Sequence, residues 1–431
     1  MPTHHSILLC LSIAILSGCA AGGAATSLAQ TSPAQSTAPT PRPSAQSPTA
    51  VAAQPADFAS WRAGFRHLAL AQSIRPDIFD AAFANVGVNA QVMKLDAYQP
   101  EFSRPIWVYL DSAVSDTRIA NGREAEAAKR ALLDSIAARH GVDPQFLLAI
   151  WGLESAYGHN YGDIRVIESL ATLAYHGRRR AFAEEQLISA LKILQTGEVT
   201  PSRMVGSWAG AMGHTQFIPT SYESYAVDYD GDGRRDIWAA DAADALASTA
   251  NYLSRFGWRQ GEPWGVEARL PSGFDYTLAD PSTRRGTAAW RALGVTRFGG
   301  AALPDYGVAS VISPAGARGP AFVVFHNFRV LKHYNNATSY ALAVGHLGDR
   351  IAGGGPFQGS WPRGDKALSQ DQKIDLQQRL TGLGYDTQGA DGIIGPNSRK
   401  AIRSFQSAQG MTPDGYENAA FLKSLRAASG G

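Results

Sequence analysis

The stretch of sequence that decides the fold reads Phe146-Leu147-Leu148-Ala149-Ile150-Trp151-Gly152-Leu153-Glu154. Glu154 lies seven residues after Leu147, four after Ile150 and three after Trp151, so these side chains share one face of a helix. The pattern therefore predicts a helix that carries a carboxylate on its apolar face. Burial of a carboxylate is costly and raises its pKa. A carboxylic acid that keeps its proton near neutral pH can act as a general acid.

Two structural interpretations of Glu154 stay open at this point. A buried arginine could pair with the carboxylate, or the end of the helix could lift Glu154 into water. Either arrangement would make Glu154 an ordinary structural residue. The helical pattern alone does not separate these arrangements from a catalytic role.

Length and composition describe a foldable chain of two or three domains, with 431 residues, 45% hydrophobic residues and a net charge of +2. The longest basic run is only Arg178-Arg179-Arg180, so we expect no nucleic-acid partner. Both cysteines, Cys10 and Cys19, fall in the first twenty residues, which excludes a disulfide or a thiolate metal site further along. We expect the protein to act as a monomer.

The first residues, 1–19, are predicted to be a lipoprotein signal peptide. Their apolar core is too short for a permanent membrane span. Leu16-Ser17-Gly18-Cys19 resembles a bacterial lipobox, in which Cys19 is lipidated, and Ala20 after it favours the outer membrane. The segment before the apolar core has no Lys or Arg, so a secretory peptide cleaved near Ala20 or after Ala29 is the alternative. Both interpretations predict export to the periplasm.

Composition then divides the rest of the chain. Residues 20–57 are rich in Ala, Ser, Thr, Gln and Pro and are predicted to be a disordered linker. Residues 58–350 form a mainly α domain, in which 263–328 contains short strand-like runs between Gly and Pro turns. Residues 351–367 form a second linker, and 368–431 form a separate module.

Periodicity and turn residues place the elements of the large domain. We expect helices over residues 77–84, 123–140, 144–154, 167–175, 181–195, 242–256 and 339–347, and strands over 265–270, 309–312 and 322–325. Asp143 before Pro144 is the predicted N-cap of the helix that carries Glu154.

The C-terminal module has a compact pattern of three short helices with Asp-Gly corners at Asp391-Gly392 and Asp414-Gly415. This pattern resembles the peptidoglycan-binding domain found at the ends of cell-wall hydrolases. A generic three-helix unit is the alternative interpretation.

The densest motif in the chain runs from Gly206 to Tyr222. Its glycines let the backbone turn tightly. Ser207 and Gln216 supply neutral hydrogen-bonding groups, while Trp208 and other aromatic residues supply flat apolar faces. A sugar needs this mixture, although a packed glycine-rich helix junction would have a similar composition.

The segment from Trp151 to Gly158, together with the motif from Gly206 to Tyr222, closely resembles the lytic murein transglycosylase B family, glycoside hydrolase family 103. Further matches are Tyr175-His176-Gly177-Arg178-Arg179, Ala250-Asn251-Tyr252 and Tyr334-Asn335-Asn336-Ala337-Thr338-Ser339-Tyr340. The resemblance implies a lysozyme-like, mostly helical domain that acts on peptidoglycan glycan strands.

The resemblance also implies residue roles. Glu154 matches the sole catalytic acid/base of the family. The matched residues that line the glycan cleft are Tyr109, Ser207, Gln216, Tyr252, Tyr334 and Asn335. Arg178 and Arg179 match a cleft-edge pair that could meet anionic peptide stems or lactyl groups, and a solvated basic turn is the alternative.

A single carboxylate fits the family reaction, whereas glycosidases usually need two. In the family, one Glu protonates the leaving oxygen of the MurNAc–GlcNAc bond. It then deprotonates the C6 hydroxyl of the same MurNAc, which closes a 1,6-anhydro ring without any cofactor. A hydrolytic muramidase on the same fold and a non-catalytic peptidoglycan-binding scaffold are the alternatives.

A second site starts at Asp228 and matches nine positions of an EF-hand calcium loop. Its expected ligands are Asp228, Asp230, Asp232 and the backbone carbonyl of Arg234, whereas Ala239 replaces the usual Glu at the twelfth position. The family resemblance implies that a later carboxylate, Asp244 or alternatively Asp241, closes a structural Ca²⁺ site. A metal-free Asp-Gly turn is the alternative.

Overall fold

The computed structural model describes residues 57–97 and 104–430. The predicted signal peptide with Cys19, and the predicted linker except for Asp57, lie outside the described residues. Within the described ranges, none of the helices combines the length and the apolar composition that a membrane crossing requires.

The described chain is mainly α-helical, which confirms the predicted fold class. The helices of the large domain are α1 (Phe58–Ala71), α2 (Pro76–Ala82), α3 (Ala90–Ala97), α4 (Ile106–Ala113), α5 (Asp116–Ala128), α6 (Arg130–His140), α7 (Pro144–Ser155), α8 (Val166–His176), α9 (Arg180–Thr196), α10 (Pro219–Tyr225), α11 (Ala243–Arg255), α12 (Thr287–Ala292), α13 (His326–Tyr334) and α14 (Thr338–Ile351). The strands are β1 (Ile164–Arg165), β2 (Val205–Gly206), β3 (Gly265–Arg269), β4 (Arg285–Gly286), β5 (Thr296–Arg297), β6 (Val308–Ile312) and β7 (Ala321–Val324).

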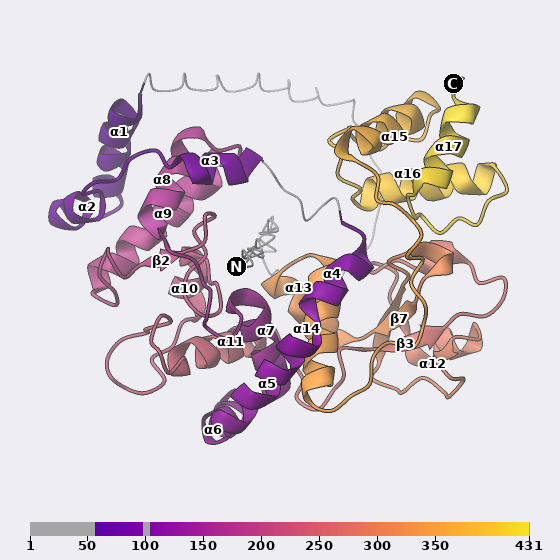
Figure 1. Ribbon diagram of the computed structural model, residues 1–431, viewed down its shortest axis with the longest axis horizontal. Coiled ribbons are helices and arrows are strands. Elements are labelled where there is room, and N and C mark those ends of the chain that lie inside the picture. Colours follow the sequence, from indigo (N-terminus) through magenta and orange to yellow (C-terminus); the bar gives the residue numbers. More distant parts are fainter. Residues whose placement is uncertain (1–56, 98–103, 431) are drawn as a thin grey trace, which may run out of the picture.

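Helix α7 lies at the centre of the large domain, between α5, α11 and α14 (Figure 1). Every residue from Phe146 to Ser155 is buried, so α7 is covered on all sides rather than on one face. Asp143 occupies the N-cap position, as predicted, but its side chain makes no capping hydrogen bond. Its carboxylate instead accepts hydrogen bonds from the Trp258 indole at 2.9 Å and the Gly261 N–H at 3.0 Å.

The single helix predicted over residues 123–140 is also wrong, because the chain breaks at Lys129 into α5 and α6. Lys129 has φ −115° and ψ 20°, outside the helical region. Its ammonium donates to the carbonyl of Asp241, 2.6 Å away. The break lets α5 pack against α7 while α6 packs against α11, so tertiary contacts override local helix propensity.

The three strands predicted within residues 263–328 correspond to β3, β6 and β7, and together with β4 and β5 they form an antiparallel five-stranded sheet in the order β4-β6-β7-β3-β5. Its register pairs Val266 with Val323, and Val311 with the same Val323 from the other side. One face of the sheet covers a separate small core that contains Trp290 and Phe325.

The C-terminal module contains α15 (Gln370–Gly382), α16 (Pro396–Ala408) and α17 (Ala419–Ala428). Its core includes Leu376, Leu380, Ile402, Phe405 and Leu425. The module lies beside the β-containing segment (Figure 1).

Two side chains of the C-terminal module fasten it to the large domain. Arg403 bonds the Asp280 carboxylate and the Ala279 carbonyl, each at 3.1 Å. Asp414 accepts a hydrogen bond from the Ala317 N–H at 2.9 Å.

Candidate active site

Glu154 is buried near the C-terminal end of α7, with 8% of its surface exposed. Its Oε1 accepts a 2.6 Å hydrogen bond from the hydroxyl of Tyr340 on α14, while its Oε2 has no partner among the described residues. Burial raises the pKa of Glu154 to about 8, although the Tyr340 bond opposes the rise. The carboxyl group therefore carries its proton at neutral pH. Neither the ion pair nor the solvent-exposed helix end describes this residue.

The end of α7 is fixed by an abrupt change of backbone conformation. Ala156 and Tyr157 both adopt positive φ, at 50° and 60°, so the helix stops one residue after Glu154. Tyr157 folds back over Gly152, where a Cβ would lie 2.5 Å from the Tyr157 ring. The Tyr157 hydroxyl donates to the Arg118 carbonyl at 2.8 Å, and Arg118 Nε donates to the Gly152 carbonyl at 3.1 Å. These contacts explain why the segment from Trp151 to Gly158 has a glycine at position 152 and a tyrosine at position 157.

Glu154 opens onto a cavity of about 840 Å³. Both parts of the protein contribute to its walls. From the large domain come Tyr109, Glu154, Asp280, Lys332, Asn335 and Tyr340. From the C-terminal module come Lys373, Arg399, Lys400, Arg403, Asp414, Tyr416 and Glu417. This volume is in the range of pockets that enclose a sizeable ligand.

Two predicted cleft residues, Tyr109 and Asn335, line the same cavity as Glu154. Burial, and to a smaller degree the nearby Glu154 carboxylate, raises the pKa of the Tyr109 hydroxyl. Asn335 is buried, and its side-chain oxygen accepts a hydrogen bond from the Ala337 N–H at 3.0 Å.

Tyr334 and Tyr252 lie behind this wall and do not line the cavity. The Tyr334 hydroxyl donates to the Thr215 carbonyl at 2.5 Å, and the Tyr252 hydroxyl donates to the His333 carbonyl at 2.6 Å. The Tyr334 ring is nearly parallel to that of Tyr340, with their centres 6.4 Å apart. In this structure the two residues therefore support the wall rather than face the cavity.

Ser207 and Gln216 shape the glycine-rich loop and also lie outside the lining of this cavity. The Ser207 hydroxyl accepts hydrogen bonds from the N–H groups of Ala209 and Ala211. The Gln216 amide donates to the carbonyls of Tyr161 and Gly213, at 3.0 and 2.9 Å. The loop is irregular rather than a helix junction, and a Cβ at Gly206 would lie 1.9 Å from the Ala211 carbonyl oxygen.

Arg178 and Arg179 stand at the start of α9 and do not line the cavity either. Arg178 pairs with the Asp96 carboxylate at 3.8 Å. The Arg179 guanidinium lies over the Phe182 ring, 5.6 Å from its centre.

Tyr340 is the residue that sequence reasoning missed. It is the hydrogen-bond partner of Glu154, yet in the sequence it is only the last residue of a matched motif. The sequence could have indicated Tyr340 as a site residue, because it lies in the same matched motif as Tyr334 and Asn335.

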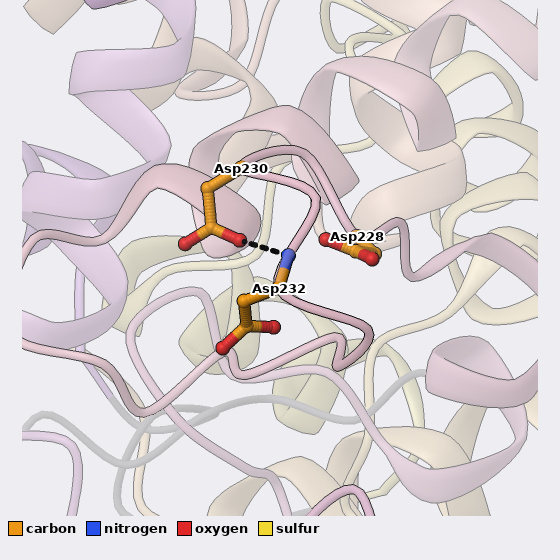
Figure 2. A group of neighbouring side chains, drawn as sticks. All are labelled: Asp228, Asp230 and Asp232. Atoms are coloured by element: carbon orange, nitrogen blue, oxygen red, sulfur yellow. Dashed lines mark hydrogen bonds between the residues drawn. The ribbon is translucent and has the colours of Figure 1, made fainter.

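The predicted calcium loop brings three carboxylates together (Figure 2). One oxygen each from Asp228, Asp230 and Asp232 lies within 4.8 Å of the other two. Asp228 also accepts hydrogen bonds from the N–H groups of Gly231 and Gly233, which curl the loop around it. Three converging oxygen donors suit a hard cation such as Ca²⁺.

Asp244 lies beside this group rather than within it. Its two oxygens accept hydrogen bonds from the N–H groups of Tyr229 and Asp236, both at 2.8 Å, and so tie together the two ends of the loop. Burial raises the pKa of its carboxyl group. The alternative ligand, Asp241, accepts a hydrogen bond from the Ala243 N–H.

The large helical domain has a buried carboxyl group at a large cavity and is joined to a three-helix module, and each of these two parts matches a known family. Residues 57–349 match the family model described as "Transglycosylase SLT domain", and residues 369–425 match "Putative peptidoglycan binding domain". The chain belongs to the transglycosylase SLT domain family, so the predicted recognition is confirmed.

Two similar proteins of known name support this family assignment. The chain is 34% identical over 220 residues to "Membrane-bound lytic murein transglycosylase B" of Escherichia coli K12, covering 49% of this chain and 58% of that protein. It therefore spans less than two thirds of this curated relative. A crystal structure of SltB3 from Pseudomonas aeruginosa with NAG-anhNAM-pentapeptide is 51% identical with a TM-score of 0.84, and the match covers 86% of this chain and all of that one.

A more distant structure is that of the Escherichia coli transglycosylase Slt35 in complex with calcium. It is 27% identical with a TM-score of 0.59, and the match covers 68% of this chain and 92% of that one.

Proposed function

We propose that the protein is a lytic transglycosylase that cleaves the MurNAc–GlcNAc bond of peptidoglycan and leaves a 1,6-anhydroMurNAc end. One observation carries the proposal: Glu154 is a buried carboxylic acid with a pKa of about 8 that opens onto a cavity of about 840 Å³. The family membership and the relatives bound to NAG-anhNAM and NAG-NAM peptides support the same reaction.

In the proposed reaction Glu154 acts twice. Its proton moves to the glycosidic oxygen, the bond from that oxygen to C1 of MurNAc breaks, and GlcNAc leaves with the new hydroxyl group. The carboxylate then removes the proton from the C6 hydroxyl while O6 bonds to C1, so the proton returns to Glu154. Oε2 suits this exchange, because Oε1 is already bonded to Tyr340 while Oε2 has no partner among the described residues.

A hydrolytic route would need a further base to activate water. Among the described residues, three other carboxylates line the cavity, and each has an arginine or a backbone N–H beside it. Asp280 pairs with Arg403, Glu417 pairs with Arg399, and Asp414 accepts a backbone hydrogen bond. The C6 hydroxyl is held by the substrate itself, and such proximity can contribute up to roughly 7–11 kcal/mol. These facts favour ring closure over hydrolysis by a muramidase.

The mass of the products tests the proposed reaction. Sacculi digested by the wild-type protein should release fragments lighter by one water than reducing ends. Glu154→Gln should abolish this release and leave sacculus binding intact, whereas Glu185→Gln, at an exposed position on α9, should keep both. Fragments of hydrolytic mass would establish the muramidase instead, and release by the Glu154 variant would refute the role of Glu154.

We also propose that the C-terminal module binds the wall and completes the cavity. Several residues of the module, including Lys400 and Arg403, line the same cavity as Glu154. Deletion of the chain after Gly364 should weaken binding to sacculi. Unchanged binding would show that the module has another role.

We propose a structural Ca²⁺ ion at Asp228, Asp230 and Asp232, with the Arg234 carbonyl and Asp244 as further ligands. The three clustered carboxylates support the site, and each oxygen of Asp244 keeps a lone pair beside its backbone bond. A bound ion would neutralise the carboxylates and hold the loop. The Slt35 relative was crystallised with calcium.

We propose that the protein is exported to the periplasm and anchored to the outer membrane through lipidated Cys19. The lipobox-like sequence and a relative named as membrane-bound support this location. Labelling with a radioactive fatty acid should be lost in Cys19→Ala, and labelling that persists in this variant would refute the anchor.

A further inference from the structure

His214 of the glycine-rich loop makes a buried contact with the helix that carries Glu154. The Trp151 indole N–H donates to His214 Nδ1 at 3.1 Å, and both side chains are about 5% exposed or less. Because Nδ1 accepts this bond, the proton of the neutral imidazole must be on Nε2. Burial lowers the pKa of His214, so this neutral form is maintained. Tyr161 packs against the ring, and Lys129, Asp236 and Asp241 are the charged groups that act on it.

A second contact joins the same two segments. The Ser155 hydroxyl donates to the His214 carbonyl at 2.6 Å and accepts a hydrogen bond from the Gly158 N–H at 3.0 Å. A Cβ at Gly158 would lie 2.4 Å from the His214 ring, so the imidazole can be accommodated only beside a glycine. The loop therefore holds α7 three residues before Glu154, at Trp151, and one residue after it, at Ser155.

The contacts continue from His214 back to Glu154 by a different path. The Thr215 carbonyl accepts the hydrogen bond of Tyr334, whose ring lies parallel to that of Tyr340. The Tyr340 hydroxyl in turn donates to Glu154 Oε1. Glu154 is thus held from two sides, through its own helix and through its hydrogen-bond partner, and both paths meet at residues 214 and 215.

We propose that His214 is a positioning residue for Glu154, acting through its hydrogen bond to Trp151. This inference rests on the proposed lytic transglycosylase activity. His214 does not touch the cavity and takes no part in the proton transfers. Its role is to fix the last turn of α7, so that the Glu154 side chain stays buried beside the cavity.

Paired substitutions separate positioning from packing. His214→Phe keeps a flat ring but removes the acceptor, whereas His214→Asn keeps an acceptor near the place of Nδ1. A displacement of about 1 Å at a reacting group can cost on the order of 100-fold, so we expect His214→Phe to lower kcat by about 10- to 100-fold with little change in KM. Its alkaline pH limit should also move to lower pH, because a looser helix admits water to Glu154. His214→Asn should restore most of kcat and the wild-type limit.

Two further variants complete the test. Trp151→Phe removes the donor of the same bond and should reproduce the effects of His214→Phe, and the double variant should be no worse than either single one. His346→Phe alters a buried histidine that stacks on Phe357, and it controls for general loss of stability. It should leave the pH limit unchanged.

The outcomes distinguish failure of the proposed activity from failure of the proposed role of His214. If wild-type protein releases no anhydro fragments, the proposed activity fails before His214 is tested. If wild-type protein is active, the role of His214 is refuted by an unchanged pH limit in His214→Phe, or by a folded His214→Asn that loses as much activity as His214→Phe. Should His214→Phe not fold, Trp151→Phe gives the same comparison.

Discussion

Glu154→Gln should stabilise the protein at alkaline pH, and the burial of Glu154 sets the size of the effect. The ordinary pKa of a glutamate is 4.5, while burial raises that of Glu154 to about 8. Between these values the folded protein keeps a proton that the unfolded chain has lost. Glu154 therefore contributes stability that is complete below the unfolded pKa and is lost as pH rises through the folded pKa.

The magnitude follows from the same two values. Between pH 5 and pH 8 the folded protein holds one proton more than the unfolded chain over a span equivalent to about 2.5 pH units. Each pH unit lowers the free energy of unfolding by about 1.36 kcal/mol. The wild-type free energy of unfolding should therefore fall by roughly 3 kcal/mol more than that of Glu154→Gln, because glutamine does not titrate. Gln also keeps the shape of the side chain and can accept the Tyr340 hydrogen bond.

Urea denaturation of both proteins at pH 5 and pH 8 measures this difference directly. Glu185→Gln on α9 is the matched control, because the same substitution at an exposed position reports the general effect of pH. If the gap between wild type and Glu154→Gln stays constant to within about 1 kcal/mol across this range, Glu154 is not a buried acid and the argument for its catalytic role fails.

Three other changes should give distinct results. Tyr340→Phe removes the bond that lowers the pKa of Glu154, so the alkaline limit of activity should move up by about one to two units; a downward shift in the pH–rate profile would contradict this. Asp228→Asn should abolish any rise of Tm on addition of Ca²⁺, which Asp386→Asn in another Asp turn should retain; an equal rise in both variants would exclude the loop as the site. Arg403→Ala removes the ion pair with Asp280, so X-ray scattering should show a larger radius of gyration, and an unchanged radius would mean that other contacts suffice.

Local patterns in the sequence predicted the central helix and the sheet because their causes are local. The apolar period around Glu154 and the short runs such as 322–325 each record which side chains must be buried. The break at Lys129 has no such signal, since no Gly or Pro stands there and the bond that accompanies it goes to the distant Asp241.

In the candidate site, too, local patterns predicted some residues and missed those that depend on long-range contacts. Glu154 could be singled out from its own helix, whereas its partner Tyr340 comes from a segment 186 residues away. Asp143 is predicted correctly as the N-cap residue, but the partners of its side chain are not predicted. Its position before Pro144 is typical of a helix cap, yet Trp258 and Gly261 take up its carboxylate. Long-range partners of this kind are set by the packed fold and leave no trace in local spacing.

Burial alone does not make a carboxyl group a catalytic acid, as Asp349 on α14 demonstrates. Burial raises its pKa to about 6, so it is mostly ionised at neutral pH, and its Oδ2 accepts a 2.9 Å hydrogen bond from the Trp264 indole. The adjoining cavity of about 200 Å³ is below the usual size of a ligand pocket. Glu154 has a higher pKa, an oxygen without a hydrogen-bond partner in the described part of the chain, and a cavity about four times larger. Access to substrate, combined with a held proton, is therefore what distinguishes Glu154 from a buried acid that only supports the fold.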